Sequence, residues 1–287
     1  MKNIELKFIN YLANLWLGSF SHSFKITKHH SWNEWRSNSK YKNNDYWQCN
    51  NLKEAYENYS WTVNEKVLGF EELSNELKKS LTHNDNYRTG LLCKKIFEWG
   101  GVSRNLNKDS SQIWINDNVI NNTLVNKILD ATHLLHPKCH DSLSRFNKND
   151  LLMNSSTTKV FAAASIENNI LIYDGRVGAA LGLIVRSFLA AEGIYEVPKE
   201  LAFLWGPPAT AGAAKLKTRD PSKDQYIFKQ LPNNSSKSTA HEIRANLTRR
   251  GSLYISEAVS RIECTKEQVS FQEFERALFM LGYDVRQ

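Results

Sequence analysis

In several stretches of this chain, apolar residues recur with the 3.6-residue period of an α-helix. The period predicts helices over residues 87–99, 124–135 and 271–281. The last of these opens with Ser270 and, three residues later, Glu273, which is the spacing of a capping box. Another amphipathic helix is expected at the N-terminus, where five apolar residues fall on one face: Ile4, Phe8, Leu12, Leu15 and Trp16.

The middle of the chain combines two predicted helices with a short apolar crossing. Residues 158–168 predict a short, alanine-rich helix, and residues 170–173 are entirely apolar or aromatic. Asp174 follows at once, where its side chain can accept hydrogen bonds from the free amides that open a helix over residues 176–191. That helix is small and apolar on most sides, which predicts that it is buried.

Two stretches are predicted to be irregular. Residues 205–238 combine prolines, glycines and basic residues, and loops of this length are uncommon unless they are functional or disordered. Residues 29–61 interleave aromatic and basic side chains, so they either offer rings on which nucleic-acid bases stack or pack those rings onto the core. Core packing is favoured, because aromatic side chains dominate burial in general. We expect a mainly α domain over residues 61–287, with residues 1–60 an N-terminal helix and aromatic-basic segment that could belong to the same domain.

Composition and charge narrow the class of protein. The formal net charge of +7 favours a polyanionic partner such as nucleic acid or an anionic membrane surface. No apolar run is long enough to span a membrane, and the N-terminal residues do not resemble an export signal. Free thiols in a reducing cytoplasm are expected, because the four cysteines are scattered and form no CxxC pair. No P-loop, GxGxxG or GxSxG sequence supports a nucleotide-dependent enzyme or an α/β-hydrolase.

One part of the chain carries a family resemblance. The sequence Ser156-Thr157-Thr158-Lys159-Val160-Phe161-Ala162, followed by Asp174-Gly175-Arg176-Val177, resembles the active-site stretch of helix-hairpin-helix DNA glycosylases, especially the 8-oxoguanine glycosylase branch. In that family a Thr-Lys-Val-Ala sequence opens one helix and an Asp-x-His/Arg-Val sequence caps the next. The resemblance implies that Lys159 and Asp174 are catalytic and that Arg176 contacts a DNA phosphate.

The hairpin itself departs from the family pattern. A Leu-Pro-Gly-Val-Gly type of sequence is usual there, whereas this chain has Met153-Asn154-Ser155-Ser156-Thr157. Glycines let the backbone approach a phosphate closely, and here Ser156, Thr157 and Thr158 would instead offer amides and hydroxyls to DNA. The resemblance therefore implies a helical glycosylase-like fold with a degenerate helix-hairpin-helix, similar to stand-alone microbial proteins that act in base excision repair or against modified phage DNA.

The residue types suit the cleavage of an N-glycosidic bond. Loss of the base builds positive charge on the sugar, and a fixed carboxylate such as that of Asp174 stabilises this charge. Lys159 can attack C1′ and form a Schiff base once its amine is neutral, a state that partial burial or a nearby cation favours. The target base must leave the stack of the duplex to be reached.

Other candidates are weaker. As a group, basic residues outside this stretch are predicted to contact nucleic acid: Lys215, Lys217, Arg219, Arg244, Arg249 and Arg250. Three residues are candidates for a base pocket, with packing in the core as the alternative: Trp99, His241 and Phe279. A group of possible metal ligands (His133, His136, Cys139 and His140) lacks a second pair at finger-like spacing, so we expect a polar helix end, with no metal and no cofactor.

The sequence thus predicts a DNA N-glycosylase that excises a modified or damaged base from double-stranded DNA. Two alternatives stay open. One is a non-catalytic module that binds nucleic acid through residues 29–61, and the other is an interaction protein whose basic face docks an acidic partner. The identity of the base, a lyase step and the oligomeric state do not follow from the sequence.

Overall fold

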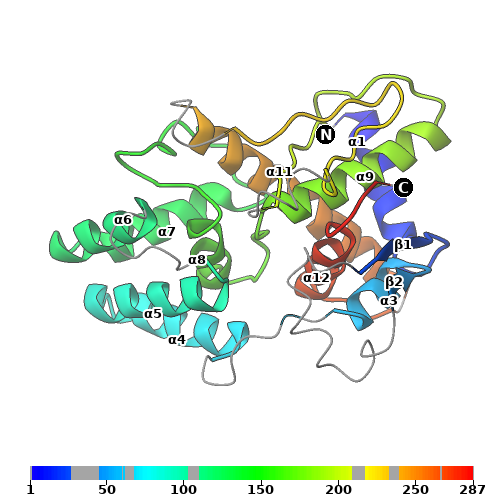
Figure 1. Cartoon of the computed structure of the whole chain (residues 1–287). Coiled ribbons are helices and arrows are strands. Elements are labelled where there is room, and N and C mark those ends of the chain that lie inside the picture. Colours follow the sequence, from blue (N-terminus) through cyan, green and yellow to red (C-terminus); the bar gives the residue numbers. More distant parts are fainter. Residues whose placement is uncertain are drawn as a thin grey trace. The chain divides into compact units, whose positions relative to one another are not determined.

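The chain is mainly helical, with a single two-stranded sheet in the part that the structure describes (Figure 1). This confirms the predicted fold class at the level of secondary structure. The computed structural model describes residues 2–26, 45–59, 61, 68–102, 110–208, 217–232, 239–265 and 267–286. None of the described helices is long and apolar enough to cross a membrane.

Two compact units make up the chain, and neither is continuous in sequence. Unit 1 consists of Met1–Thr62, Asp174–Leu231 and Tyr254–Gln287, and unit 2 of Val63–Tyr173 and Pro232–Leu253. These units do not follow the expected division at residues 60 and 61; residues 1–60, which could belong to the same domain as later residues, share unit 1 with two later segments. The N-terminal helix packs on these segments, since the ring of Phe8 lies 5.4 Å from that of Phe188 and 5.9 Å from that of Tyr254.

Unit 1 is built around the long helix α9 (Gly175–Ala191), which is apolar on most sides and almost wholly buried, as the sequence predicted. Helices α1 (Asn3–Asn14) and α12 (Phe271–Leu281) pack on α9, and α12 also packs on α3 (Leu52–Glu57). The short sheet pairs β1 (His22–Lys25) with β2 (Tyr46–Cys49) in antiparallel register, with Phe24 opposite Trp47.

Unit 2 surrounds the short helix α8 (Thr157–Ala164), every residue of which is buried. Three helices contact α8: α4 (Phe70–Thr82), α5 (Asn86–Trp99) and α7 (Leu124–Leu135). Helix α6 (Ser110–Ile120) packs on α5 and α7. The long helix α11 (Ala240–Glu263) begins in unit 2 and ends in unit 1.

Helices whose ends are marked in the sequence by capping residues, glycine or proline occur where they were predicted. Helix α7 covers the predicted residues, α5 begins one residue early, and α12 begins at its capping box, with both Ser270–Glu273 hydrogen bonds formed. Helix α8 ends before the predicted residue 168, because Ser165 adopts an extended conformation (φ −63°, ψ 120°). The described part of residues 205–238 forms no helix, as expected, and Trp205 and Gln230 form an isolated parallel bridge there.

Candidate active site at the start of helix α9

Asp174 caps helix α9 as predicted. Its backbone is extended (φ −114°, ψ −177°), and its Oδ1 accepts hydrogen bonds from the amides of Arg176 (2.8 Å) and Val177 (3.0 Å). Within the described residues, the second oxygen of this carboxylate accepts no hydrogen bond. The carboxylate is therefore fixed through one oxygen and half-buried, and its other oxygen can face a ligand.

Glycines bring two other segments of unit 1 against this helix start. A Cβ on Gly175 would lie 2.7 Å from the carbonyl oxygen of Gly206, and the Gly206 amide donates to the carbonyl of Gly175 (3.2 Å). A Cβ on Gly282 would overlap the carbonyl of Arg176. Only glycine permits such close backbone contacts. Gly282, which directly follows α12, therefore packs against the first turn of α9.

Aromatic rings surround the guanidinium of Arg176. Its central carbon lies 4.0 Å from the ring centre of Tyr283, 4.5 Å from that of Phe279 and 5.6 Å from that of Trp61. The rings pack edge to face on one another: the ring centres of Trp61 and Phe279 are 5.4 Å apart, and those of Phe279 and Tyr283 are 5.7 Å apart. Cation–π attraction holds the charge in place, but rings accept no ordinary hydrogen bond. The buried Nη1 of Arg176 has no hydrogen-bond partner in the described part of the chain.

Arg219 is a second poorly compensated cation in unit 1. Its buried Nε likewise lacks a hydrogen-bond partner among the described residues. Burial and, next, the charge of Arg176 lower the pKa of Arg219 to about 9, and Asp174 acts in the opposite direction. Since a guanidinium remains charged at neutral pH, this depressed pKa expresses the free-energy cost of holding a cation there.

The C-terminal tail positions Arg219. The amide of Val285 donates to the carbonyl of Thr218 at 2.7 Å, which ties the turn at residues 217–219 to the end of α12. Burial raises the pKa of Tyr283, and the charges of Arg176 and Arg219 oppose that rise. Among these described side chains, two guanidinium charges and one carboxylate leave a net charge of +1, at a helix N-terminus that adds further positive potential. We call Asp174, Arg176, Arg219, Phe279 and Tyr283 the α9 site.

The α9 site can bind an oxyanion and present a carboxylate beside it. A phosphate group bound there would balance the charge of Arg176 and Arg219, and it would accept from their unpaired N–H groups once a movement of the site exposes these buried atoms. The free oxygen of Asp174 could then stabilise a cation developing on the sugar attached to that phosphate.

Lys159, the other predicted catalytic residue, lies in unit 2 on helix α8. The side chain is 7% exposed, and its Nζ donates a hydrogen bond of 2.7 Å to the carbonyl of Ser155. Its aliphatic part passes directly over Gly100, where any Cβ would collide with it. The Lys159 side chain is thus held by Gly100 along its aliphatic part and by the Ser155 carbonyl at its amine.

Asn154, which the sequence analysis did not single out, caps helix α8. Its Oδ1 accepts from the amides of Ser156 (2.8 Å) and Thr157 (3.0 Å), whereas the Ser156 side chain makes no cap. The hydroxyl of Thr158 accepts from the amide of Tyr173 (3.2 Å), and that of Thr157 accepts from the amide of Asn154 (3.0 Å). Thr157 and Thr158 are fully buried, backbone included, so their predicted contact with DNA would require a change of conformation.

The three residues predicted for a base pocket have different surroundings. In unit 2, the ring of Trp99 lies 4.5 Å from that of Phe70, and His241 is buried with its Nδ1 2.8 Å from the carbonyl oxygen of Met153. In unit 1, Phe279 belongs to the α9 site. The three are not brought together within one unit.

The predicted basic group is also divided. Lys217 is exposed in unit 1, in the same turn as Arg219, with a left-handed backbone (φ 49°). Arg244 is half-buried and Arg249 donates to two backbone carbonyls, both in unit 2. Lys215 lies outside the described residues, and Arg250 has a buried guanidinium nitrogen.

Aromatic residues of the 29–61 segment pack within unit 1 where they are described. Trp47 is fully buried, Tyr56 stacks on Trp16 at 6.4 Å, and Tyr59 meets Phe279 at 6.0 Å, whereas Tyr46 is exposed. This agrees with the favoured interpretation of core packing. The aromatic residues Trp32, Trp35 and Tyr41 lie outside the described residues.

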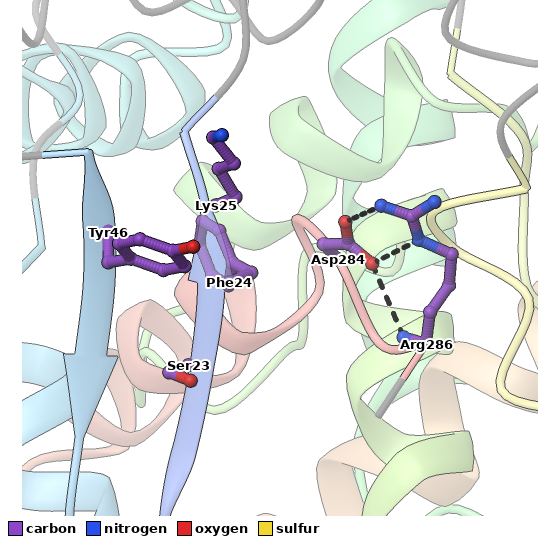
Figure 2. A pocket seen from close by; sticks show the side chains of 6 residues that line it. All are labelled: Ser23, Phe24, Lys25, Tyr46, Asp284 and Arg286. Carbon is purple, nitrogen blue, oxygen red and sulfur yellow. Dashed lines mark hydrogen bonds and ion pairs between the residues drawn. The ribbon is translucent and has the colours of Figure 1, made fainter.

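A hollow of about 270 Å³ opens beside the sheet of unit 1 (Figure 2). Its lining comes from both strands and the C-terminal tail: Ser23, Phe24, Lys25, Tyr46, Asp284 and Arg286. The carboxylate of Asp284 accepts a hydrogen bond of 2.8 Å from Nε of Arg286. Because its one carboxylate is already paired, we assign no chemistry to this hollow.

Comparisons with protein-family models, with characterised proteins and with solved structures find no match to this chain. The assignment of function therefore depends on the residues and on the resemblance of the motif.

Proposed function

We propose that this chain is a DNA glycosylase that removes a modified or damaged base from duplex DNA, in repair or in defence against phage. One observation carries the proposal. Asp174 is fixed through Oδ1 by two amides, its other oxygen takes no hydrogen bond from the described residues, and two guanidiniums beside it have unpaired N–H groups.

Asp174 supplies the electrostatic part of the reaction. As the C1′–N bond breaks, its electron pair leaves with the base and positive charge develops on C1′ and the ring oxygen. An ionised carboxylate held in place needs no reorganisation at that moment, which is why fixed charges contribute strongly to catalysis. Asp174 stands at the N-terminus of α9, where its side chain binds the first free amides of the helix.

Lys159 supplies the nucleophile in a bifunctional enzyme. Its neutral amine bonds to C1′ as the C1′–N bond breaks, and one amine proton passes to the departing base. The C1′–O4′ bond then breaks, O4′ takes up the second amine proton, and an imine joins Nζ to C1′. In a monofunctional enzyme, water attacks C1′ instead and the product is an abasic sugar. The Lys159 side chain is buried and passes over Gly100. Both features support attack by lysine, because they hold the side chain in place and limit its contact with water.

Phosphate contacts at the α9 site would hold the DNA. Arg176 and Arg219 come from two segments of unit 1, and the rings of Phe279 and Tyr283 fix the first of them. A cation with unmet hydrogen bonds is costly in the free protein and is relieved when an oxyanion binds. This is the pattern expected of a ligand site rather than of a structural ion pair.

Incubation with a panel of modified duplexes tests the proposal. Duplexes carrying oxidised guanine or bulky phage-type cytosines are incubated with the full chain and then treated with mild alkali, which breaks the strand at abasic sites. We expect strand breaks at the modified base of at least one duplex, because excision leaves an abasic sugar there. Intact DNA across the panel, with tight and salt-sensitive binding, would instead favour a non-catalytic binding module.

Arg219→Met should weaken DNA binding and at the same time stabilise the free protein. Loss of one phosphate contact is expected to reduce affinity by roughly tenfold at low salt and to lower the slope of log K against log salt by about 1. Removing a poorly compensated charge should leave the free energy of unfolding equal or higher. Filter binding at several salt concentrations and urea unfolding measure the two effects.

Lys229→Met is the matched control, because Lys229 is an exposed cation of the same unit. Both measurements should remain close to those of the unchanged protein. Destabilisation by Arg219→Met without any change in DNA binding would mean that Arg219 has a structural role, and the phosphate assignment would fail.

A further inference from the structure

Three possible metal ligands of different chemistry meet in unit 2. The ligand atoms of His133, Cys139 and Asp141 all lie within 4.8 Å of one another, and Nε2 of His133 is 3.5 Å from Oδ2 of Asp141. His133 lies in the last turn of α7, and the other two follow the turn at Pro137.

Hydrogen bonds that involve none of these side chains hold the group together. The amide of Cys139 donates to the carbonyl of His136 at 2.9 Å. From α11, Nη1 of Arg249 donates to the carbonyls of Asp141 (2.8 Å) and Leu134 (3.3 Å). Arg249 therefore ties the segment that carries Cys139 and Asp141 to the end of α7.

The structure selects a different ligand set from the one considered in the sequence. His136 points its Nε2 at Oε2 of Glu167, 3.0 Å away, and His140 does not belong to the group. Asp141 takes their place. Spacing alone could not show this, because the turn at Pro137 decides which side chains face His133.

We propose that His133, Cys139 and Asp141 bind a zinc ion, with water as the fourth ligand. Imidazole, thiolate and carboxylate are all zinc ligands, whereas Mg²⁺ and Ca²⁺ do not select sulfur. A neutral imidazole, a thiolate and a carboxylate carry two negative charges, which Zn²⁺ balances.

The geometry is close to what tetrahedral zinc requires. Ligand atoms around a tetrahedral zinc are separated by about 3.3–3.6 Å, given bond lengths of about 2.0–2.3 Å. The His133–Asp141 separation of 3.5 Å already meets this, and both side chains are about two-thirds exposed and free to rotate toward the half-buried thiol. Such a zinc would clamp the Cys139–Asp141 segment to α7, independently of the proposed glycosylase activity.

Cobalt spectroscopy tests the site directly. The full chain, without a histidine tag, is prepared reduced and metal-free and is then titrated with Co²⁺. We expect saturation at one Co²⁺ per chain, visible absorption typical of tetrahedral cobalt, and a thiolate-to-cobalt charge-transfer band in the near ultraviolet. Added Zn²⁺ should displace the cobalt, and zinc binding at pH 7 should release a proton as Cys139 ionises.

Cys139→Ser and His133→Ala should each weaken zinc binding by at least the roughly 10- to 100-fold that loss of an outer-shell partner costs. Cys139→Ser should also abolish the charge-transfer band. Zinc should raise the melting temperature of the unchanged protein and not that of these variants. Melting of the metal-free proteins checks that both variants fold.

Cys264→Ser is the control, because Cys264 is an exposed free cysteine that belongs to no such group among the described residues. It should bind Co²⁺ like the unchanged protein. The proposal is overturned if the charge-transfer band is absent, if it survives Cys139→Ser, or if Cys264→Ser removes it.

Discussion

Asp174→Asn is expected to reduce base excision on the order of 10²- to 10³-fold while DNA binding stays equal or becomes slightly tighter. The variant keeps the shape of the side chain and removes its charge. The excision rate falls because the cation at C1′ loses its fixed counter-charge. The DNA affinity does not fall, because the carboxylate of Asp174 repels phosphates. Single-turnover excision and equilibrium binding on the same duplex measure the two effects.

The fold should survive this substitution. Asparagine caps helices about as well as aspartate, and its side-chain oxygen can still accept from the amides of Arg176 and Val177. A change in stability of less than about 1 kcal/mol is therefore expected. This separates a catalytic role from a capping role, since a cap alone would tolerate the change.

Asp85→Asn is a matched control. Asp85 caps α5 in the same manner, accepting from the amide of Arg88 at 2.9 Å, but it has no part in the α9 site. Its excision rate should equal that of the unchanged protein. Full activity in Asp174→Asn, or equal losses in both variants, would contradict the catalytic assignment.

The features that sequence analysis predicted best are local. Helices α7 and α12 begin and end where their apolar period, capping residues and following proline or glycine indicate. The Asp174 cap is equally local, because a residue that precedes a buried helix needs only its own side chain to bind the first amides.

What could not be predicted depends on contacts between distant segments. Arg219 was one of several basic residues in the sequence, and a hydrogen bond between the distant residues Val285 and Thr218 ties its turn to the segment that carries Tyr283. The rings around Arg176 come from α12, from Tyr283 just after that helix and from Trp61, and no local pattern connects them with Arg176. The division into two units has the same origin, since Phe8 finds its partners in α9 and α11.

The serine- and threonine-rich approach to α8 illustrates an ambiguity of residue type. Hydroxyl side chains before a helix suit both helix capping and phosphate binding. In the structure Asn154 does the capping and the hydroxyls of Thr157 and Thr158 bind backbone amides. Contacts of Ser156, Thr157 and Thr158 with DNA stay a prediction.

Lys159→Met should abolish a covalent complex that borohydride traps. Reduction converts the imine between Nζ and C1′ into a stable amine, so the unchanged protein should migrate with its DNA on a denaturing gel. Methionine has no amine but fills similar space over Gly100, and the substitution removes the hydrogen bond from Nζ to the Ser155 carbonyl. We expect no adduct from Lys159→Met.

Lys95→Met provides the comparison, because Lys95 is an exposed lysine of the same unit, on α5. It should give as much adduct as the unchanged protein. An adduct that persists in Lys159→Met would assign the nucleophile to another amine. Continued excision with no adduct from the unchanged protein would make water the nucleophile; Lys159 would then lose its covalent role, while the role of Asp174 in stabilising the sugar cation would stand, since both routes pass through that charge.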